Sequence, residues 1–256
     1  MLQPVQLLET SRPSSQEHQL RIEIAAACRL LDRLEMSDMT SGYMSVKLPD
    51  EEERYLVTPY GLLFNEITAS SIVKVDFEGN IVGDSSHNYT IYSPGFIYLN
   101  RIIHRARPDA QAIMHLHPIH ATALSSLAGE LLPCSEAGIW LYRQIGYGDF
   151  ILPGGLVDEA QEKRLVSSLG DKQILMVRNH GTITLGTSIP EAFLMSVLLE
   201  NACKIQLLAE STGRKLICPP EETCLKAAQQ LNDVSPLWDW NALVRQLDRQ
   251  ESSYQT

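Results

Sequence analysis

Three of the chain's seven histidines stand in a pattern that suits metal binding. His115 and His117 are two residues apart in an apolar segment, and alternate residues of a β-strand point to the same face. Both imidazole rings could therefore converge on one ion. His180 follows a second apolar segment and precedes Gly181, which lets the backbone turn sharply. Three neutral imidazoles with one open position form a known type of catalytic zinc site.

A structural interpretation of these histidines competes with the chemical one. Two histidines at this spacing are a weak signal, because such residues are often hydrogen-bonded parts of a fold. No spacing in the sequence connects His180 with the pair. From these residues alone, a metal site and a set of structural histidines both stay open.

The other histidines have less to recommend them for chemistry. His18 and His104 fall on expected helices, where we place them at the surface, and His87 falls in a polar loop. His120 follows the pair closely, after a proline. It suits either an outer-sphere group at a metal or the start of a helix.

The segments that must position these histidines follow from apolar periodicity and from the places of proline and glycine. Helices are predicted over residues 16–36, 95–106, 121–127, 157–169, 190–211 and 219–232. Strands are predicted over 43–48, 55–58, 72–76, 80–82, 111–117 and 174–179, with the third and fourth as a hairpin. This interleaving indicates an α/β or α+β class, built in layers around a sheet. Two long connections, near 83–94 and 128–156, are candidates for functional loops.

Length and composition indicate one folded domain. The chain has 256 residues, 44% of them hydrophobic, which is enough to bury a sizeable core. The first residues are polar and contain proline, so we expect a flexible arm over 1–15. The domain is expected over 16–235, followed by a polar C-terminal tail over 236–256.

Net charge limits the classes of partner, and the lack of targeting signals in the sequence bears on the cellular location. A net charge of −10 and a pI near 5.2 argue against nucleic acid and anionic membranes. No apolar run approaches the ~20 residues that cross a bilayer, and the N-terminus lacks the pattern of a signal peptide. The five cysteines are scattered, with no CxxC pair, which favours reduced, buried thiols. We therefore expect a cytoplasmic protein.

Several segments resemble the class II aldolase/adducin family. Residues 114–125 resemble the metal-binding HxHxxHxTA segment of class II sugar-phosphate aldolases and their epimerase relatives. Residues 178–186 resemble the segment that supplies the third metal histidine, and residues 190–206 are similar to the helix after it. Residues 58–76 and 105–109 are closer to the adducin branch than to the aldolases. On these segments the chain is identified as a member of the family.

The resemblance implies a fold and a metal site. The fold would be a three-layer α/β/α sandwich with a mixed, mostly antiparallel central sheet. His115, His117 and His180 would hold a divalent metal, most readily Zn²⁺, with Mn²⁺, Fe²⁺ or Co²⁺ as alternatives. Catalytic members of the family act on small molecules and are typically homotetramers with the site near a subunit interface, so a homo-oligomer is expected.

Two phosphate-binding parts of the aldolase pattern are altered. The aldolases use a GNxSxR segment whose asparagine contacts the substrate phosphate. This chain keeps Gly42, Ser45 and Lys47 there but has Tyr43 in place of the asparagine. The turn that also lies at the phosphate in the aldolases carries the bulky Tyr60 before Gly61. These positions are the candidates for substrate binding.

The third altered part is the start of the helix before ArgProAsp (107–109). The aldolases have two serines and a catalytic glutamate there, and this chain has Pro94, Gly95 and Phe96. Phe96 joins the candidate substrate-binding residues, although a phenyl ring cannot transfer a proton. Adducin-like sequences share the Gly-Phe pair. A simpler interpretation makes Tyr43 an ordinary strand residue and Phe96 part of the core.

Two functions follow from this pattern. The first is a metal-dependent lyase-type enzyme that stabilises an enolate on a small, non-phosphorylated hydroxy- or oxo-carboxylate or carbonyl compound. Its proton carrier would come from the group His120, Glu136, Tyr142 and Asp149. The second is an adducin-like binding or scaffold module without turnover, because fold does not settle function.

Overall fold

The computed structural model describes residues 15–51, 53–83, 94–150, 158–231 and 237–256. Of residues 94–98 only the backbone is described. The arm predicted over 1–15 therefore lies almost wholly outside the described residues. The same holds for His87, for most of the connection predicted near 83–94 and for the end of the one near 128–156.

A mixed sheet forms the middle of the described fold. Its order is β3-β2-β1-β4-β7-β6-β5, and all neighbours are antiparallel except β5 and β6, which are parallel. The seven strands are β1 (Tyr43–Lys47), β2 (Arg54–Val57), β3 (Val73–Asp76), β4 (Ala112–Leu116), β5 (Ile145–Gly148), β6 (Ile174–Val177) and β7 (Gly181–Gly186).

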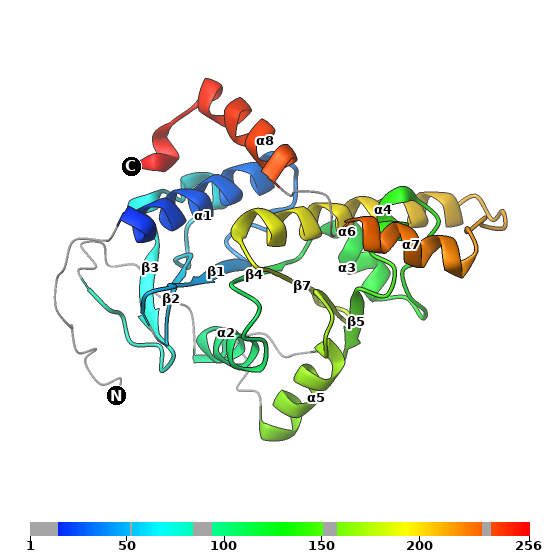
Figure 1. Ribbon diagram of the computed structural model, residues 1–256, viewed down its shortest axis with the longest axis horizontal. Helices are drawn as coiled ribbons and strands as arrows, with labels where there is room; N and C mark the ends of the chain where they lie inside the picture. The colour runs from blue at the N-terminus through cyan, green and yellow to red at the C-terminus, as the bar shows by residue number, and fades with distance from the viewer. Residues whose placement is uncertain (1–14, 52, 84–93, 151–157, 232–236) are drawn as a thin grey trace.

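Helices cover both faces of this sheet. Figure 1 shows α1, α6 and α8 on one side and α2 and α5 on the other. The helices are α1 (Ser15–Arg33), α2 (Pro94–Ala106), α3 (Ile119–Ser125), α4 (Glu136–Trp140), α5 (Glu159–Leu169), α6 (Ile189–Glu210), α7 (Glu221–Leu231) and α8 (Leu237–Gln250). The predicted three-layer α/β/α class with a mostly antiparallel sheet is confirmed.

Strand β4 shows how the sequence divides the core between the two faces. Ala112, Met114 and Leu116 belong to the apolar cluster formed with α1 and α6. Ile113, between them, belongs to the cluster formed with α2 and α5. Because side chains alternate along a strand, His115 points to the same face as Ile113. The metal-ligand candidate on β4 therefore lies on the α2 and α5 side of the sheet.

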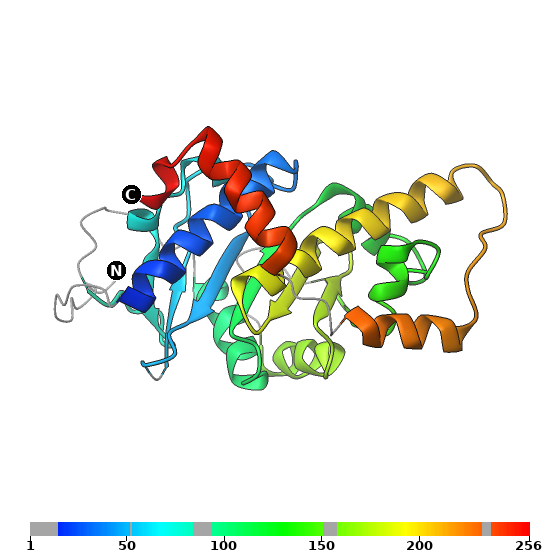
Figure 2. The same cartoon turned by 45° about the horizontal axis from the view of Figure 1, so that its top comes forward.

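The polar tail predicted over 236–256 is instead a helix with a short 3-10 turn, α8 and Ser253–Gln255. Trp240, Leu247 and Tyr254 are at most 6% exposed and join the core beside α1. Figure 2 shows α8 crossing α1 and the start of α6. The prediction was wrong because the overall polarity of this segment hides one apolar face, on which buried residues recur at helical spacing.

Two other predictions need correction. The connection predicted over 128–156 contains α4 and β5. In addition, no strand was predicted where β7 lies, because glycines bound that segment and threonines interrupt its apolar residues. The expectation of buried thiols holds for Cys28, Cys203 and Cys224, whereas Cys134 is half-buried and Cys218 is exposed.

Helix α6 is the one described helix that is long and apolar enough to cross a membrane by length and composition. Half of its most apolar stretch is buried within the fold. It packs against β7, β4 and α3. These contacts are those of a core helix, which must be apolar on more than one face.

Candidate metal centre

The ends of three neighbouring strands bring the predicted metal histidines together. His115 is near the end of β4, and His117 lies just beyond it. His180 closes the tight turn from β6 to β7, where Asn179 has a φ of 57°. Since β4 and β7 are antiparallel, with Leu116 opposite Thr182, the end of β4 lies beside the start of β7.

Gly181 is required at this junction. A Cβ atom at Gly181 would lie 2.5 Å from the carbonyl oxygen of Leu116 and 2.6 Å from the ring of His117. Real Cβ atoms do not approach other atoms so closely, so a larger residue would push β4 and β7 apart. The glycine after His180 therefore permits the close approach that the cluster needs.

The three imidazole rings face one another. Their centroids are 4.9 Å apart for His115 and His117, 5.0 Å for His115 and His180, and 5.1 Å for His117 and His180. One ligand nitrogen from each ring lies within 4.8 Å of the other two. The Nε2 atoms of His115 and His117 are 3.2 Å apart. Two nitrogens on one tetrahedral zinc ion would be about 3.3 Å apart, so this spacing fits a shared metal.

Hydrogen bonds on the far side of two rings decide which nitrogen is available. The Nδ1 atom of His115 is 3.0 Å from the carbonyl oxygen of Thr182, and that of His117 is 3.1 Å from Oδ2 of Asp38. A carbonyl or carboxylate oxygen accepts, so each Nδ1 carries the hydrogen and each Nε2 keeps its lone pair. In the neutral state the short Nε2 contact then joins two lone pairs, an arrangement that a cation between them would relieve.

Burial keeps His115 in the form that a metal requires. The residue is 8% exposed, and burial together with the neighbouring His117 and His180 holds the pKa of its imidazole well below the usual range. A neutral imidazole is the ligand form, because protonation would occupy the lone pair. The donor set, its spacing and its protonation thus fit a divalent metal such as zinc, and the assignment of these three residues stays a prediction.

Tyr43, the first residue of β1, and Gly42 just before it both lie against His115. Tyr43 pairs with His115 across the two strands, and their ring centroids are 5.2 Å apart. Gly42 has a φ of 87°, and a Cβ there would lie 3.0 Å from the carbonyl oxygen of His115. Tyr43 is 2% exposed, and burial raises the pKa of its phenol. Tyr43 therefore supports His115 from within the core.

Ser45 belongs to a buried polar group rather than to the cluster. Its Oγ donates to Oδ1 of Asn100 at 2.6 Å and lies 3.1 Å from Nε2 of His104. The expectation that His104 is a surface residue is wrong: it is 3% exposed and packs beside Tyr55 and Phe77. Burial, helped by the nearby charge of Lys47, lowers the pKa of His104 to about 3. The inner face of α2, not its outer face, carries this histidine.

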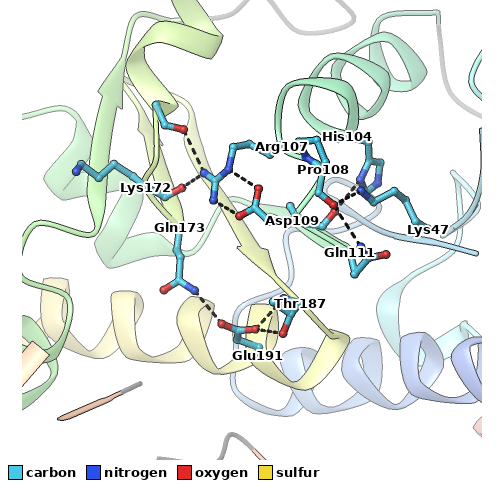
Figure 3. A network of polar contacts seen from close by, with 12 residues as sticks. Lys47, His104, Arg107, Pro108, Asp109, Gln111, Lys172, Gln173, Thr187 and Glu191 are labelled. Carbon is cyan, nitrogen blue, oxygen red and sulfur yellow. Dashed lines mark hydrogen bonds and ion pairs between the residues drawn. The ribbon is translucent and has the colours of Figure 1, made fainter. Parts of the chain in front are cut away.

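Lys47 lies at the end of β1 away from the histidines. It lies four residue steps along the strand from Tyr43, which is about 14 Å in an antiparallel strand. Its Nζ donates to the carbonyl oxygen of Pro108 at 2.9 Å, as Figure 3 shows. The structure therefore does not bring Lys47 or Ser45 to the candidate metal centre.

The end of the sheet away from the histidines, here called the far end, carries a polar network (Figure 3). The guanidinium of Arg107 donates to both carboxylate oxygens of Asp109, at 2.9 and 2.6 Å. The same group donates to the carbonyl oxygen of Lys172 and so ties α2 to the start of β6. Nearby, Gln173 donates to Glu191 on α6 at 2.8 Å. This end is held by side chains that bond one another.

Two further candidates for substrate binding lie at the histidine end. Tyr60 and Gly61 follow β2, whose last residue pairs with Ser45, so the chain there has passed beyond the start of β1. Tyr60 is half-buried, and Gly61 is exposed with a φ of 90° and open space where a Cβ would stand. The side chain of Phe96 lies outside the described residues.

Among the four candidate proton carriers, His120 is the most firmly bound elsewhere. Its Nδ1 is 2.6 Å from Oε1 of Glu200 on α6, and the same carboxylate accepts from the backbone amides of His120 and Ala121. Helix α6 covers the face of the sheet opposite His115. The structure therefore turns His120 away from the cluster and makes it part of the start of α3.

The remaining three candidates lie later in the chain, Glu136 and Tyr142 between α3 and β5 and Asp149 just after β5. Glu136 is exposed in the first turn of α4, which packs on α6 and α7. Tyr142 is half-buried, with the Arg143 guanidinium 5.7 Å from its ring centre. Asp149 is exposed directly after β5, and the ring of the next residue, Phe150, is 5.7 Å from that of His180. Of the three, Asp149 has this link to the cluster.

Asp38 is the site residue that the sequence analysis missed. It lies in the break over 37–42 between α1 and β1, and its carboxylate contacts His117. No periodicity or motif marks an aspartate in such a connection. Only the pairing of β1 with β4, which brings this connection to the end of β4, could have pointed to it.

Comparison with known proteins decides the family. The family model of the Class II Aldolase and Adducin N-terminal domain matches residues 22–207. The chain belongs to the class II aldolase/adducin family. An aldolase II superfamily protein from Pseudomonas syringae has a similar structure, with 36% identity, a TM-score of 0.88, and coverage of 96% of this chain and 98% of that one.

Two further similar proteins carry different names. L-fuculose 1-phosphate aldolase from Glaciozyma antarctica PI12 has a TM-score of 0.74 at 25% identity, with coverage of 86% of both chains. Alpha-adducin of Rattus norvegicus is 38% identical over 77% of this chain but only 27% of its own length. The family thus joins this chain to an aldolase and to an adducin, as the sequence segments predicted.

Proposed function

We propose that this chain is a metal-dependent lyase-type enzyme of the class II aldolase/adducin family. Its substrate would be a small, non-phosphorylated hydroxy- or oxo-carboxylate or carbonyl compound, and the reaction would pass through an enolate. The observation that carries this proposal is the convergence of three imidazole nitrogens from His115, His117 and His180 within 4.8 Å. A scaffold has no need of such a cluster, because facing lone pairs lower its stability.

The chain's own residues would bind the metal and border the substrate beside it. His115, His117 and His180 would be its ligands, and Gly181 leaves the room for them. When bound, a divalent ion, first of all Zn²⁺ and otherwise Mn²⁺, Fe²⁺ or Co²⁺, would supply Lewis-acid polarisation of a carbonyl group. Tyr60 and Gly61, at the same end of the sheet, are the proposed boundary of the substrate.

The absence of a phosphate group from the substrate is inferred from the places of β1 residues. A phosphate monoester needs several donors in fixed positions. Tyr43 is enclosed in the core, the hydroxyl of Ser45 is engaged with Asn100, and Lys47 lies at the far end of the strand. The start of α2 carries no hydroxyl at Pro94 or Gly95. These residues therefore favour anchoring through the metal rather than through a phosphate.

Proton transfer is assigned to the connection after β5. The usual glutamate position holds Phe96, and His120 is bonded to Glu200. Asp149 is exposed and precedes Phe150, which contacts His180, so we favour Asp149 over Glu136 and Tyr142 as the proton carrier. Exposure keeps a carboxylate able to exchange its proton with water.

A homo-oligomer in the cytoplasm is the proposed working form. Met39, which follows Asp38, is 76% exposed, and Ile119, two residues after His117, is 72% exposed. Large apolar side chains on both sides of the candidate centre are typical of a surface that another subunit covers. In the homotetramer that the family resemblance implies, another subunit would cover the candidate centre.

The competing function is an adducin-like binding module without turnover. It is favoured by the 38% identity to alpha-adducin over 200 residues. Elemental analysis of protein purified without added metal separates the two functions. About one divalent ion per chain supports the enzyme, and a metal-free chain that takes up none supports the binding module.

The substrate class is tested on the metal-loaded protein. Hydroxy- and oxo-carboxylates should raise the melting temperature and turn over, whereas aldose and ketose phosphates should do neither. Cleavage of a ketose 1-phosphate at ~1 per second or faster, a rate typical of enzymes, would show that the inference from the β1 residues is wrong.

A further inference from the structure

Asp38 is set against His117 by a strained turn. The backbone amide of Ser41 donates to the carbonyl oxygen of Asp38 at 2.8 Å, and Met39 between them has a φ of 47°. A non-glycine residue in this left-handed region costs free energy, and such residues concentrate at functional sites. The turn leads into Gly42, which rests on the carbonyl oxygen of His115. The carboxylate is therefore held relative to both histidines.

The partners of the two β4 histidines differ in charge. His115 donates to a backbone carbonyl, which is neutral and cannot be changed by mutation. His117 donates to the carboxylate of Asp38 at 3.1 Å, and that carboxylate is 43% exposed. A carboxylate behind a metal-binding imidazole fixes the ring's tautomer and orientation and raises its basicity as a ligand. Of the two histidines of the β4 segment, His117 is the one with this support.

We propose that Asp38 is a positioning residue for the candidate metal centre. Its carboxylate keeps the hydrogen of His117 on Nδ1 and turns Nε2 toward His115 and His180. It also places one negative charge beside three neutral imidazoles, so that the centre and a divalent ion together carry a single positive charge. The effect on metal affinity rests on the function proposed above, whereas the effect on the tautomer does not.

The experiment compares the wild type with Asp38→Ala, Asp38→Asn and the control Glu35→Gln. Glu35 is an exposed carboxylate in the same connection between α1 and β1, so its removal changes the local charge equally. The tautomer of His117 is measured on metal-free protein from long-range ¹⁵N–¹H correlations of the imidazole rings. Metal affinity is measured with Co²⁺, by competition with a chelator and by the visible spectrum of the bound ion.

We expect an Nδ1–H tautomer at His117 in the wild type and in Glu35→Gln, and its loss in Asp38→Ala. Asp38→Asn keeps an acceptor oxygen, so the tautomer should persist. Cobalt affinity should fall by about 10- to 100-fold in Asp38→Ala, by less in Asp38→Asn, and not in Glu35→Gln. The Co²⁺ spectrum of Asp38→Ala should also change, which a role in stability alone would not cause.

Two results would overturn the inference. One is an unchanged His117 tautomer in Asp38→Ala, and the other is a cobalt affinity that Glu35→Gln lowers as much as Asp38→Ala does. If the wild type binds no cobalt, the proposed function fails, and the tautomers of the metal-free proteins still decide whether Asp38 orients His117. An equal melting temperature of the metal-free variants shows that the exposed turn has not unfolded.

Discussion

The two ends of the central sheet use their polar side chains in opposite ways. At the far end, Arg107 with Asp109 and Gln173 with Glu191 complete each other's hydrogen bonds and tie helices to strands (Figure 3). At the other end, the Nε2 atoms of His115 and His117 face each other without a donor between them. The first arrangement stabilises the fold. The second leaves two Nε2 lone pairs that do not stabilise the fold and could bind a cation.

Left-handed backbone residues also lie beside the histidine cluster. Met39 directly follows Asp38, Gly42 lies against the carbonyl oxygen of His115, and Asn179 directly precedes His180; all three have a positive φ. Sequences that are otherwise consistent with their fold break local rules mainly where function requires it. The comparison therefore assigns stability to one end of the sheet and chemistry to the other, and substitutions at the two ends should separate them.

The largest effect is expected from His117→Ala. Two imidazoles hold zinc poorly, so we expect zinc affinity to fall by at least roughly 100-fold. Isothermal titration with Zn²⁺ measures it, with His18→Ala as the control because His18 is an exposed histidine on α1. Equal zinc affinity in both variants would show that His117 is not a metal ligand.

The glycines at the two ends of β7 test the comparison within one strand. A Cβ at Gly181 would meet Leu116 and His117, and one at Gly186 would meet the backbone of Ser188 and Ala192, each at 2.7 Å or less. Overpacking of this kind costs about 1–3 kcal/mol of unfolding free energy, so Gly181→Ala and Gly186→Ala should both be less stable in urea. Only Gly181→Ala should also lose zinc affinity; a loss in Gly186→Ala would contradict the division.

The buried His104 should make stability depend on pH. Its folded pKa, about 3, lies below the ordinary value of 6.5, so the unfolded chain binds a proton that the folded chain refuses. The stability it allows is complete above pH 6.5 and is lost as the pH falls toward 3, by about 1.4 kcal/mol per pH unit. Urea unfolding of the wild type and His104→Gln between pH 7 and 4 measures this. The slope should be shallower in the variant, and equal slopes would contradict a buried neutral histidine.

The smallest effect is expected at Asp109. Its hydrogen bonds with Arg107 lead a set of causes that lower the pKa of its carboxyl, so the stability from this pair is present above pH 4 and disappears below it. Asp109 is 62% exposed, and exposed ion pairs contribute about 0.2–1 kcal/mol. Asp109→Asn should lose this amount at pH 7, less near pH 3.5, and no zinc affinity. A change in zinc affinity would show that the far end of the sheet influences the metal centre, contrary to the division of the two ends.

Much of the fold was predictable because its helices and strands carry apolar periodicity. The exceptions were segments whose environment overrides their composition. α8 is polar on average yet buries Trp240, and β7 is rich in threonine and glycine yet lies between β4 and β6. His104 was misplaced because a single histidine does not indicate which face of a helix is buried.

The candidate site was predictable only in part. The HxH pair and His180 were found from strand geometry and family resemblance, and the structure brings them together. Asp38 contacts His117 across 79 residues of sequence, through a pairing of β1 with β4 that no local pattern announces. Ser45 and Lys47 matched a family segment, but strand geometry carries them away from the histidines.

X-ray absorption at the metal edge, on protein purified without added metal, tests the central claim most directly. The spectrum identifies the element and its first shell in one measurement. We predict zinc, or another of the divalent ions named, with three imidazole nitrogens at about 2.0–2.2 Å. An absent metal edge, or a first shell of sulfur or of fewer than three imidazoles, would contradict the assignment of His115, His117 and His180.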